Sequence, residues 1–221
     1  MLNLASDRKY LFFDTETSGL PANYKEPPSA GPNWPRILQL AWMLCDEYGH
    51  ILDQSSSYVY PEPELVIDQG AAAVNGLSIL KLKSDGKPLA AVLDDFLYAY
   101  SRCSVLVAHN MAFDLPVLQS ELHRKQMVIL MNKAHLCTME TSRNFCKLPT
   151  VGAQYNRGTF KRPKLAELSR TVFGTEMKNA HDAKWDVWYL KEAFFGARES
   201  IQEWKEAGLQ SGKQLSLLDG I

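Results

Sequence analysis

The chain has 221 residues, of which 46% are hydrophobic, and its formal net charge at pH 7 is −1. This length allows one substantial core and lies below the range in which chains divide into several domains. Proteins that hold long nucleic acids through many phosphate contacts are usually basic, so the near-neutral charge argues against that class.

The N-terminal residues lack the long apolar stretch of a signal peptide, and no run approaches the roughly 20 apolar residues of a membrane span. The four cysteines form no Cys-x-x-Cys pair, and three of them lie in or beside apolar runs. We therefore expect a cytoplasmic protein with reduced, packed thiols and no contact with a membrane.

Five short segments are predicted to be the strands of a sheet. They fall at about residues 10–14, 36–45, 51–60, 104–108 and 134–138. A turn signal from Asp46 to Gly49 separates the second run from the third, so the first three strands should form an antiparallel meander.

Apolar residues repeat at helical spacing from Leu89 to Tyr100, after Pro88, and again from Leu165 to Val172. Strands and helices therefore alternate along the chain. This order predicts an α/β fold in which helices flank a five-stranded mixed sheet.

Two carboxylates, Asp14 and Glu16, stand one residue apart at the end of the first strand. Strand side chains alternate between faces, so both acids point the same way and two like charges are crowded together. Such crowding is typical of a bound cation, and oxygen ligands without Cys or His favour Mg²⁺ or Mn²⁺ over zinc. A solvated strand end is the alternative interpretation.

Two later helices begin close to further acidic residues. After the fourth strand, Asp114 stands at a predicted helix start, with Pro116 in the first turn. Further on, Asp182 is in a position to cap a helix in which Asp186 lies about one turn inside. Five helical residues turn through about 140°, so His181 and Asp186 can share a site only if His181 lies in the preceding loop.

Together these residues form three motifs: Asp14-x-Glu16-Thr-x-Gly, His109-Asn-x-x-Phe-Asp114 and His181-x-Ala-x-x-Asp186. In order and spacing they resemble the three exonuclease motifs of the DEDD superfamily, in its DEDDh branch. That family includes the proofreading epsilon subunit of bacterial DNA polymerase III and ribonuclease T. The resemblance spans residues 8–197 and implies a ribonuclease H-like fold for that domain.

The resemblance also implies an activity, a metal-dependent 3′–5′ exonuclease that releases nucleoside 5′-monophosphates. The implied catalytic set is Asp14, Glu16, Asp114, His181 and Asp186. The four carboxylates would bind two Mg²⁺ or Mn²⁺ ions, which activate water and stabilise the leaving 3′ oxygen. His181 would take the proton of the water.

Five more residues in or beside the motifs are implied in substrate binding: Thr17, Gly19, Leu20, Asn110 and Phe113. Gly19 should let the chain turn tightly after the strand, and Leu20, by analogy with relatives, would wedge against the terminal base. His109 follows a buried strand, so we expect it to anchor its loop by hydrogen bonding rather than to bind metal.

Residues 21–36 hold five of the eleven prolines and must form an irregular loop directly after the first motif. This loop is longer than the corresponding turn in the simplest relatives. Trp34 has two possible roles that the sequence leaves open. It anchors the loop on the sheet, or it borders the substrate end.

Six basic residues and no acidic residue lie between Glu140 and Glu167: Arg143, Lys147, Arg157, Lys161, Arg162 and Lys164. This run is a candidate for tracking a nucleic-acid backbone, and Tyr155 and Phe160 within it could stack on bases. An ordinary solvated loop is the alternative interpretation.

Residues 198–221 are expected to form a C-terminal extension. Its glycine and serine residues precede a compact apolar cluster, which predicts a flexible tether that ends in a binding peptide. The five residues from Gln214 to Leu218 resemble the peptides with which bacterial replication and repair proteins bind the sliding clamp. The alternative is a tail that packs on its own domain.

The motifs and the tail together favour an exonuclease that acts on single-stranded or frayed DNA 3′ ends in proofreading or repair. An exoribonuclease that trims RNA is the main alternative, because the distinction depends on a 2′-OH contact that the sequence does not place. A clamp-tethered binding module with a silent site is disfavoured, because all five catalytic residues are present.

Overall fold

The structure is a computed structural model that describes residues 8–127, 129–150, 160–178 and 180–206. Its sheet has the strand order β3-β2-β1-β4-β5. The strands are β1 (Tyr10–Thr17), β2 (Ile37–Cys45), β3 (Ile51–Tyr58), β4 (Val105–Ala108) and β5 (Ala134–Cys137). The first three pair antiparallel, whereas β4 and β5 run parallel to β1. The predicted meander and mixed sheet are confirmed.

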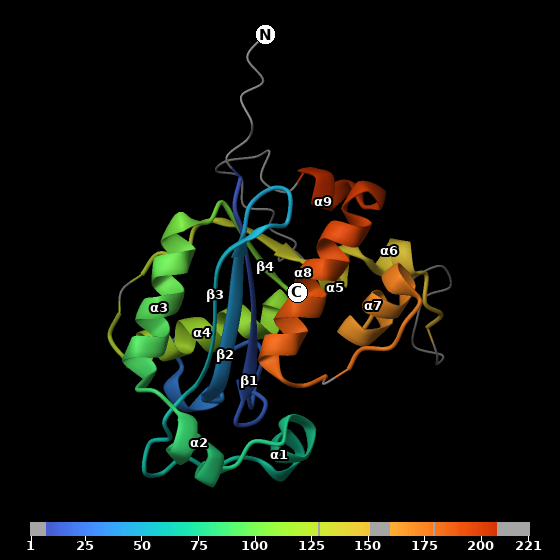
Figure 1. The fold of residues 1–221 in the computed structure, drawn as a ribbon. Coiled ribbons are helices and arrows are strands. Elements are labelled where there is room, and N and C mark those ends of the chain that lie inside the picture. Colours follow the sequence, from blue (N-terminus) through green and yellow to red (C-terminus); the bar gives the residue numbers. More distant parts are fainter. Residues whose placement is uncertain (1–7, 128, 151–159, 179, 207–221) are drawn as a thin grey trace.

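Helices cover both faces of this sheet (Figure 1). The helices of the described chain are α1 (Gln69–Asn75), α2 (Ile79–Asp85), α3 (Leu89–Arg102), α4 (Met111–Arg124), α5 (Thr138–Thr141), α6 (Arg143–Cys146), α7 (Leu165–Phe173), α8 (Ala183–Ala197) and α9 (Gln202–Glu206). Of these, α1 and α2 lie below the end of the sheet in Figure 1. Short 3₁₀ turns lie at Gly31–Asn33 and Arg198–Ser200. Among the described residues, no helix is long and apolar enough to cross a membrane.

Two apolar cores lie on opposite faces of β1. Leu11 and Phe13 pack into the core beneath α3 and α4, whereas Tyr10 and Phe12 pack into the core beneath α8. Because side chains alternate along a strand, the next even-numbered residues, Asp14 and Glu16, continue the α8 face. The strand pairing with β2 carries on through both acids, so the sheet itself fixes their direction.

Helix α4 begins earlier than the sequence predicted. It starts at Met111, after Asn110 at φ 99°, so Pro116 lies inside the helix rather than in its first turn. Asn tolerates this left-handed conformation better than most residues, and here it turns the chain out of β4. The proline only removes one backbone donor from the helix interior, so it was a poor marker of the helix start.

The proline-rich segment is fastened to the sheet and to α4. The Trp34 side chain is only 3% exposed, packs in the first core and donates its indole N–H to the Pro27 carbonyl at 3.1 Å. The Arg124 guanidinium donates to the carbonyls of Gly31 and Trp34, both at 2.6 Å. The anchoring role of Trp34 is thereby confirmed.

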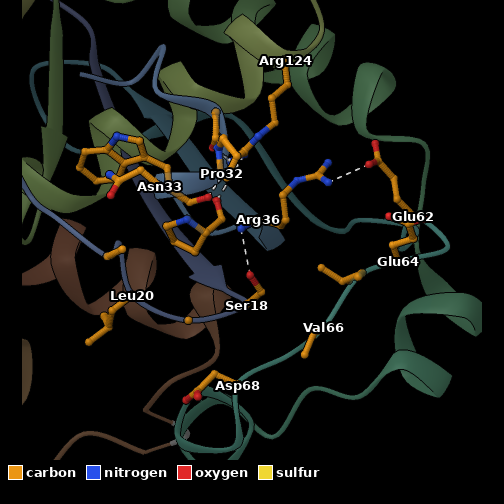
Figure 2. Close-up of a pocket in the computed structure, with 16 residues that line it drawn as sticks. Ser18, Leu20, Pro32, Asn33, Arg36, Glu62, Glu64, Val66, Asp68 and Arg124 are labelled. Atoms are coloured by element: carbon orange, nitrogen blue, oxygen red, sulfur yellow. Dashed lines mark hydrogen bonds and ion pairs between the residues drawn. The ribbon is translucent and has the colours of Figure 1, made fainter. Parts of the chain in front are cut away.

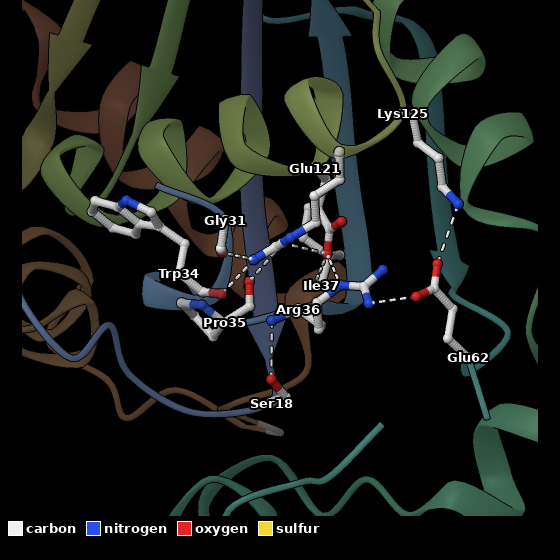
Figure 3. Close-up of polar contacts among 10 residues, drawn as sticks. Ser18, Gly31, Trp34, Pro35, Arg36, Ile37, Glu62, Glu121 and Lys125 are labelled. Atoms are coloured by element: carbon white, nitrogen blue, oxygen red, sulfur yellow. Dashed lines mark hydrogen bonds and ion pairs between the residues drawn. The ribbon is translucent and has the colours of Figure 1, made fainter. Parts of the chain in front are cut away.

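A network of charges joins this segment to its surroundings (Figure 3). The buried Glu121 Oε1 accepts from Arg36 Nε at 2.8 Å and forms an ion pair with Arg124 Nη1 at 3.2 Å. Arg36 also pairs with Glu62 at 2.7 Å, and Glu62 pairs with Lys125 at 3.2 Å. The segment is therefore held by opposite charges in direct contact.

The described part of the C-terminal extension packs on the domain. Ile201 and Trp204 are buried in the second core, and the Trp204 indole donates to Thr141 Oγ1 at 2.6 Å. The peptide from Gln214 to Leu218 lies outside the described residues. Of the cysteines, Cys45 and Cys103 are buried, the other two are half-buried, and all four are free thiols.

Candidate active site

Three acids from two elements converge at the end of β1. Asp14 and Glu16 of β1 and Asp186 of α8 each offer a carboxylate oxygen, and these oxygens lie within 4.8 Å of one another. The convergence follows from the packing, because α8 covers the face of β1 on which both strand acids stand. The structure thus brings together three of the four predicted carboxylates.

The fourth acid, Asp114, reaches β1 from the opposite face. Its carboxylate is 3% exposed, and its Oδ1 accepts from the Thr15 hydroxyl at 2.7 Å and from the Thr15 N–H at 3.2 Å. Asp114 lies outside the group of three, yet its charge contributes to the raised pKa of Asp14. Asp114 therefore bonds β1 at Thr15, between the two motif acids.

Burial and like charges raise the pKa of each of these acids. Burial is the main cause for Asp14, whose pKa is well above its usual value, and Asp114, Asp186 and Glu16 add to the rise. Burial also raises the pKa of Glu16 to about 8, that of Asp114 to about 7 and that of Asp186 to about 6. The cluster is a site where negative charge is costly without a counter-charge.

The hydrogen bonds of Asp186 indicate whether a cation fits among the three carboxylates. Its Oδ2 accepts from the His181 backbone N–H at 3.3 Å, but its Oδ1 is buried without a hydrogen-bond partner. Buried polar atoms in proteins are nearly always satisfied, so this oxygen calls for a partner. Three facing carboxylates with one unsatisfied oxygen suit a hard divalent cation such as Mg²⁺ or Mn²⁺.

His181 lies in the loop before α8. This is the position that it needs in order to share a site with Asp186. Its backbone has φ 69° and its side chain is exposed. Asp182 is the predicted cap, and it accepts from the Lys184 N–H at 3.1 Å and from Gln39 Nε2 at 2.9 Å. The start of α8 is therefore fixed to β2, while the imidazole next to it stays open to solvent.

His109 is half-buried and joins three segments. Its Nε2 lies 2.9 Å from the Pro163 carbonyl and its Nδ1 lies 2.9 Å from Thr138 Oγ1. Burial lowers the pKa of His109 to about 4, so the ring is neutral near pH 7. A carbonyl only accepts, so Nε2 carries the proton. The expected anchoring role is confirmed.

The predicted substrate-binding residues differ in how accessible they are. Leu20 is 74% exposed, and Phe113 is half-buried against the first core. The Thr17 hydroxyl donates to the Gly19 carbonyl at 2.8 Å, which stabilises the turn that Gly19 was expected to allow. Asn110 makes no side-chain cap for α4. Of the five, Leu20 offers the most free apolar surface.

A cleft of about 1020 Å³ opens beside Leu20 (Figure 2). Ser18 and Gly19 at the end of β1 form one wall, and residues 31–36 form another. The third wall contains Glu62, Glu64, Val66 and Asp68. Val66 is 80% exposed, so Leu20 and Val66 present apolar side chains in a cleft that also contains three acids and two arginines.

Two residues near the acids were missed by sequence reasoning. Thr15 donates a hydrogen bond to Asp114 and lies between the two motif acids. Its hydroxyl at that position was the feature of the sequence that could have indicated this role. Asn75 donates to the Thr17 carbonyl at 3.2 Å, and its hydrogen bond to Glu16 opposes the rise in the pKa of that acid. Gly76, which follows Asn75 at φ 68°, marks the end of α1 in the sequence.

The comparisons with known proteins agree with this geometry. A model of the exonuclease family matches residues 11–194. The PolC-type DNA polymerase III of Streptococcus thermophilus is 25% identical over 178 residues, which are 80% of this chain and 10% of the relative. That of Streptococcus suis is 27% identical over 182 residues, 82% of this chain and 10% of the relative. The chain thus spans about a tenth of the length of these relatives.

The fold of this chain is similar to those of solved structures. Escherichia coli exonuclease I in complex with a dA16 oligonucleotide superposes with a TM-score of 0.68 at 19% identity, covering 87% of this chain and 41% of the other. The zinc-bound form of its complex with single-stranded DNA gives the same TM-score, identity and coverage. These similarities confirm the ribonuclease H-like fold.

Proposed function

Because this chain belongs to the exonuclease family and is a 3′–5′ exonuclease domain, we propose that its substrate is the single-stranded or frayed 3′ end of DNA. The observation that carries the proposal is the convergence of Asp14, Glu16 and Asp186 within 4.8 Å at the end of β1. The preference for DNA is supported by the polymerase relatives and by the exonuclease I structures, which were determined with DNA oligonucleotides.

In the proposed site, Asp14, Glu16 and Asp186 hold the metal, and Asp114 supports it directly or through water. Two Mg²⁺ or Mn²⁺ ions, when bound, would supply Lewis-acid stabilisation of the phosphate and of the leaving 3′ oxygen. The unsatisfied oxygen of Asp186 supports this assignment. Asp114 is held by the hydroxyl of Thr15, the residue next to Asp14 in β1.

His181 is the proposed general base. Its position in the loop before α8 lets the exposed imidazole swing towards a substrate. The backbone N–H of His181 meanwhile stays bonded to Asp186 Oδ2 at 3.3 Å. Imidazole accepts a proton readily near neutral pH. The ring would remove the proton of the attacking water, and the water oxygen would bond to phosphorus as the P–O3′ bond breaks. The 3′ oxygen would stay on the shortened strand and take up a proton, and a nucleoside 5′-monophosphate would be released.

The substrate contacts are assigned to the loop after β1 and to the start of α4. Leu20 would wedge against the terminal base, with Thr17 and Gly19 shaping the turn that presents it. Asn110 and Phe113 would face the sugar and base from α4. The exposure of Leu20, 74%, supports its role most directly.

The proposed domain comprises residues 8–197, with residues 198–221 as the C-terminal extension. A role in proofreading or repair implies a cytoplasmic location, and the peptide from Gln214 to Leu218 would tether the enzyme to the sliding clamp. Deletion of residues 214–218 should then abolish clamp binding in a pull-down with purified clamp. Retention of clamp by the shortened chain would contradict the tether.

The activity is tested with matched 3′-labelled and 5′-labelled single strands of DNA and RNA, in Mg²⁺, in Mn²⁺ and in EDTA. Stepwise release of 5′-mononucleotides from DNA 3′ ends, lost in EDTA and in Asp14→Asn, is expected. Asp94→Asn, which alters an exposed acid of α3, is the matched control and should keep full activity. Faster digestion of RNA would favour the exoribonuclease, and no product from either polymer would contradict the proposal.

A further inference from the structure

A cluster of cations lies after β5, and we call it the basic platform. It consists of Arg143, Lys147, Lys161, Arg162 and Lys164. Among the described residues from Thr138 to Leu168 there are five basic and two acidic side chains, a net charge of +3 in a chain of net charge −1. This concentration of positive charge contrasts with the rest of the molecule.

Backbone carbonyls and a half-buried histidine fix the platform in place. Arg143 donates from Nε and Nη2 to the Phe160 carbonyl at 3.1 and 2.8 Å. The Lys161 N–H donates to the Leu148 carbonyl at 3.0 Å. His109 donates to the Pro163 carbonyl at 2.9 Å, between Arg162 and Lys164. The cations are therefore held beside the second motif.

The topology places the platform on the same edge of the sheet as the catalytic carboxylates. β1, β4 and β5 run parallel, so their carboxyl ends meet at one edge. Asp14 and Glu16 lie at the end of β1, His109 follows β4, and α5 follows β5 directly. Neighbouring strands are about 4.8 Å apart, so the ends of β1 and β5 are roughly 10 Å apart.

Three of the five cations already have acidic partners. Arg143 and Arg162 pair with Glu140, at 3.7 and 2.5 Å, and Lys161 pairs with Glu167 at 2.6 Å. Arg162 nevertheless remains 60% exposed. Lys147 and Lys164 are exposed, and neither has an ion pair within the described part of the chain. These two lysines are the cations most available to an outside anion.

On the other side of the carboxylates the charge is reversed. The cleft beside Leu20 carries Glu62, Glu64 and Asp68 (Figure 2). Its two arginines are both held in ion pairs with acids, Arg36 with Glu62 and Arg124 with Glu121. A phosphate chain would be repelled by that cleft and attracted by the platform. The difference in charge thus favours a path for the substrate strand over the platform rather than over the cleft.

We propose that the basic platform binds the phosphates of the substrate strand on the 5′ side of the scissile bond. This inference rests on the proposed function, in which the 3′-terminal nucleotide lies at the carboxylates. The remaining strand must lead away from them in the 5′ direction, and it runs from β1 across β4 to the platform. Lys147, Arg162 and Lys164 are its phosphate contacts.

The test is the salt dependence of oligothymidylate binding in EDTA, where no cleavage occurs. The substitutions suit the local backbone: Lys147→Asn, because Lys147 has φ 50°, and Lys164→Ser, because Lys164 is the N-cap of α7. Each should weaken binding up to about fivefold at low salt. Each should also lower the slope of log Kd against log salt by about 0.7, the value for one phosphate contact on a single strand.

Arg8→Ala is the matched control, because it removes one positive charge just before β1, at the opposite edge of the sheet. It should leave the slope at the wild-type value. Slopes of both lysine variants equal to that of Arg8→Ala would overturn the proposal.

A second readout separates this proposal from the proposed function. For an active enzyme, the kcat/KM for a long oligothymidylate, divided by that for the p-nitrophenyl ester of thymidine 5′-phosphate, should fall in both lysine variants. An unchanged ratio would overturn the platform even if the exonuclease activity is confirmed. If the wild type cleaves nothing, the proposed function fails, and the slopes in EDTA still decide whether the platform binds the strand.

Discussion

Two groups of buried charges lie close to the ends of β1 and β2, and they are built in opposite ways. In one, Glu121 forms ion pairs with Arg36 and Arg124, so each charge meets its opposite (Figure 3). In the other, Asp14, Glu16 and Asp186 face one another with oxygens within 4.8 Å. The chain supplies its own counter-charges where charge fastens a loop, and it leaves them out where a cation is to bind.

Two glutamates express this difference as opposite changes in pKa. Hydrogen bonding to Arg36 lowers the pKa of Glu62 to about 2, whereas burial and the charge of Asp186 raise that of Glu16 to about 8. The first acid is stabilised in its charged form by the fold. The second is destabilised by it, which is typical of functional rather than structural sites.

The largest expected effect comes from breaking the cluster of like charges. Asp14→Asn should lower kcat at least about a thousandfold, the scale of loss when a group that stabilises transition-state charge is removed. The fold should persist, because the change removes a like charge from a buried cluster. Activity is measured on 3′-labelled DNA, with far-ultraviolet circular dichroism as the control for folding. Retention of more than about a tenth of the activity would contradict the assignment of Asp14.

Breaking the network of opposite charges should instead cost stability. Glu121→Ala leaves Arg124 and part of Arg36 without their buried partner, which should destabilise the protein by about 3–5 kcal/mol. Urea denaturation measures this loss, and Glu121→Gln should lose less because it keeps an acceptor. A loss below about 1 kcal/mol for Glu121→Ala would show that the network does not fasten the loop.

The comparison also predicts a dependence of stability on pH. Between the ordinary pKa of Glu16, near 4.5, and its folded value of about 8, the folded protein binds more protons than the unfolded one. The free energy of unfolding of the metal-free protein should therefore fall as the pH rises through this window. Relative to Glu16→Gln, the fall should reach at least about 1 kcal/mol, or roughly 2–4 °C in Tm.

Mg²⁺ should reverse this trend, because it binds the deprotonated carboxylates. Thermal unfolding with and without Mg²⁺ should give a larger stabilisation at pH 8 than at pH 5. Glu16→Gln should show little of that difference. Equal stabilisation at both pH values would mean that Mg²⁺ binds elsewhere.

The smallest effect concerns the support behind β1. Thr15→Val removes the 2.7 Å hydrogen bond to Asp114 and should lower kcat about tenfold, as expected for loss of an outer-shell partner. It should destabilise the protein by about 1 kcal/mol. Thr15→Ser, which keeps the hydroxyl, should retain nearly full activity. Equal rates for the two variants would remove Thr15 from the account.

Most of the sheet could be predicted because β1, β2 and β4 are rich in apolar residues and a turn signal separates β2 from β3. All five strands lie within a few residues of their expected positions. β1 was predicted to end at Asp14, but it continues to Thr17 because these polar residues keep pairing with β2. The motif acids were recognisable by their spacing, and the geometry brings Asp14, Glu16 and Asp186 together.

Other features depend on contacts that no local pattern encodes. The bond between Thr15 and Asp114 joins residues 99 positions apart, and it decides from which face Asp114 approaches. Helix α1 has no buried residues, so it showed no apolar period. Glu140 and Glu167 flank the basic run in the sequence. The sequence did not reveal that these two acids form ion pairs with three of its basic residues.

The central claim is that Asp14, Glu16 and Asp186 form a site for a divalent cation. The most direct test is calorimetric titration of Mn²⁺ at pH 8 into the wild type, Asp14→Asn and the matched Asp94→Asn. The account predicts saturable binding to the wild type and to Asp94→Asn, and its loss in Asp14→Asn. Binding of Mn²⁺ to Asp14→Asn as tight as to the wild type, or no binding to either, would contradict it.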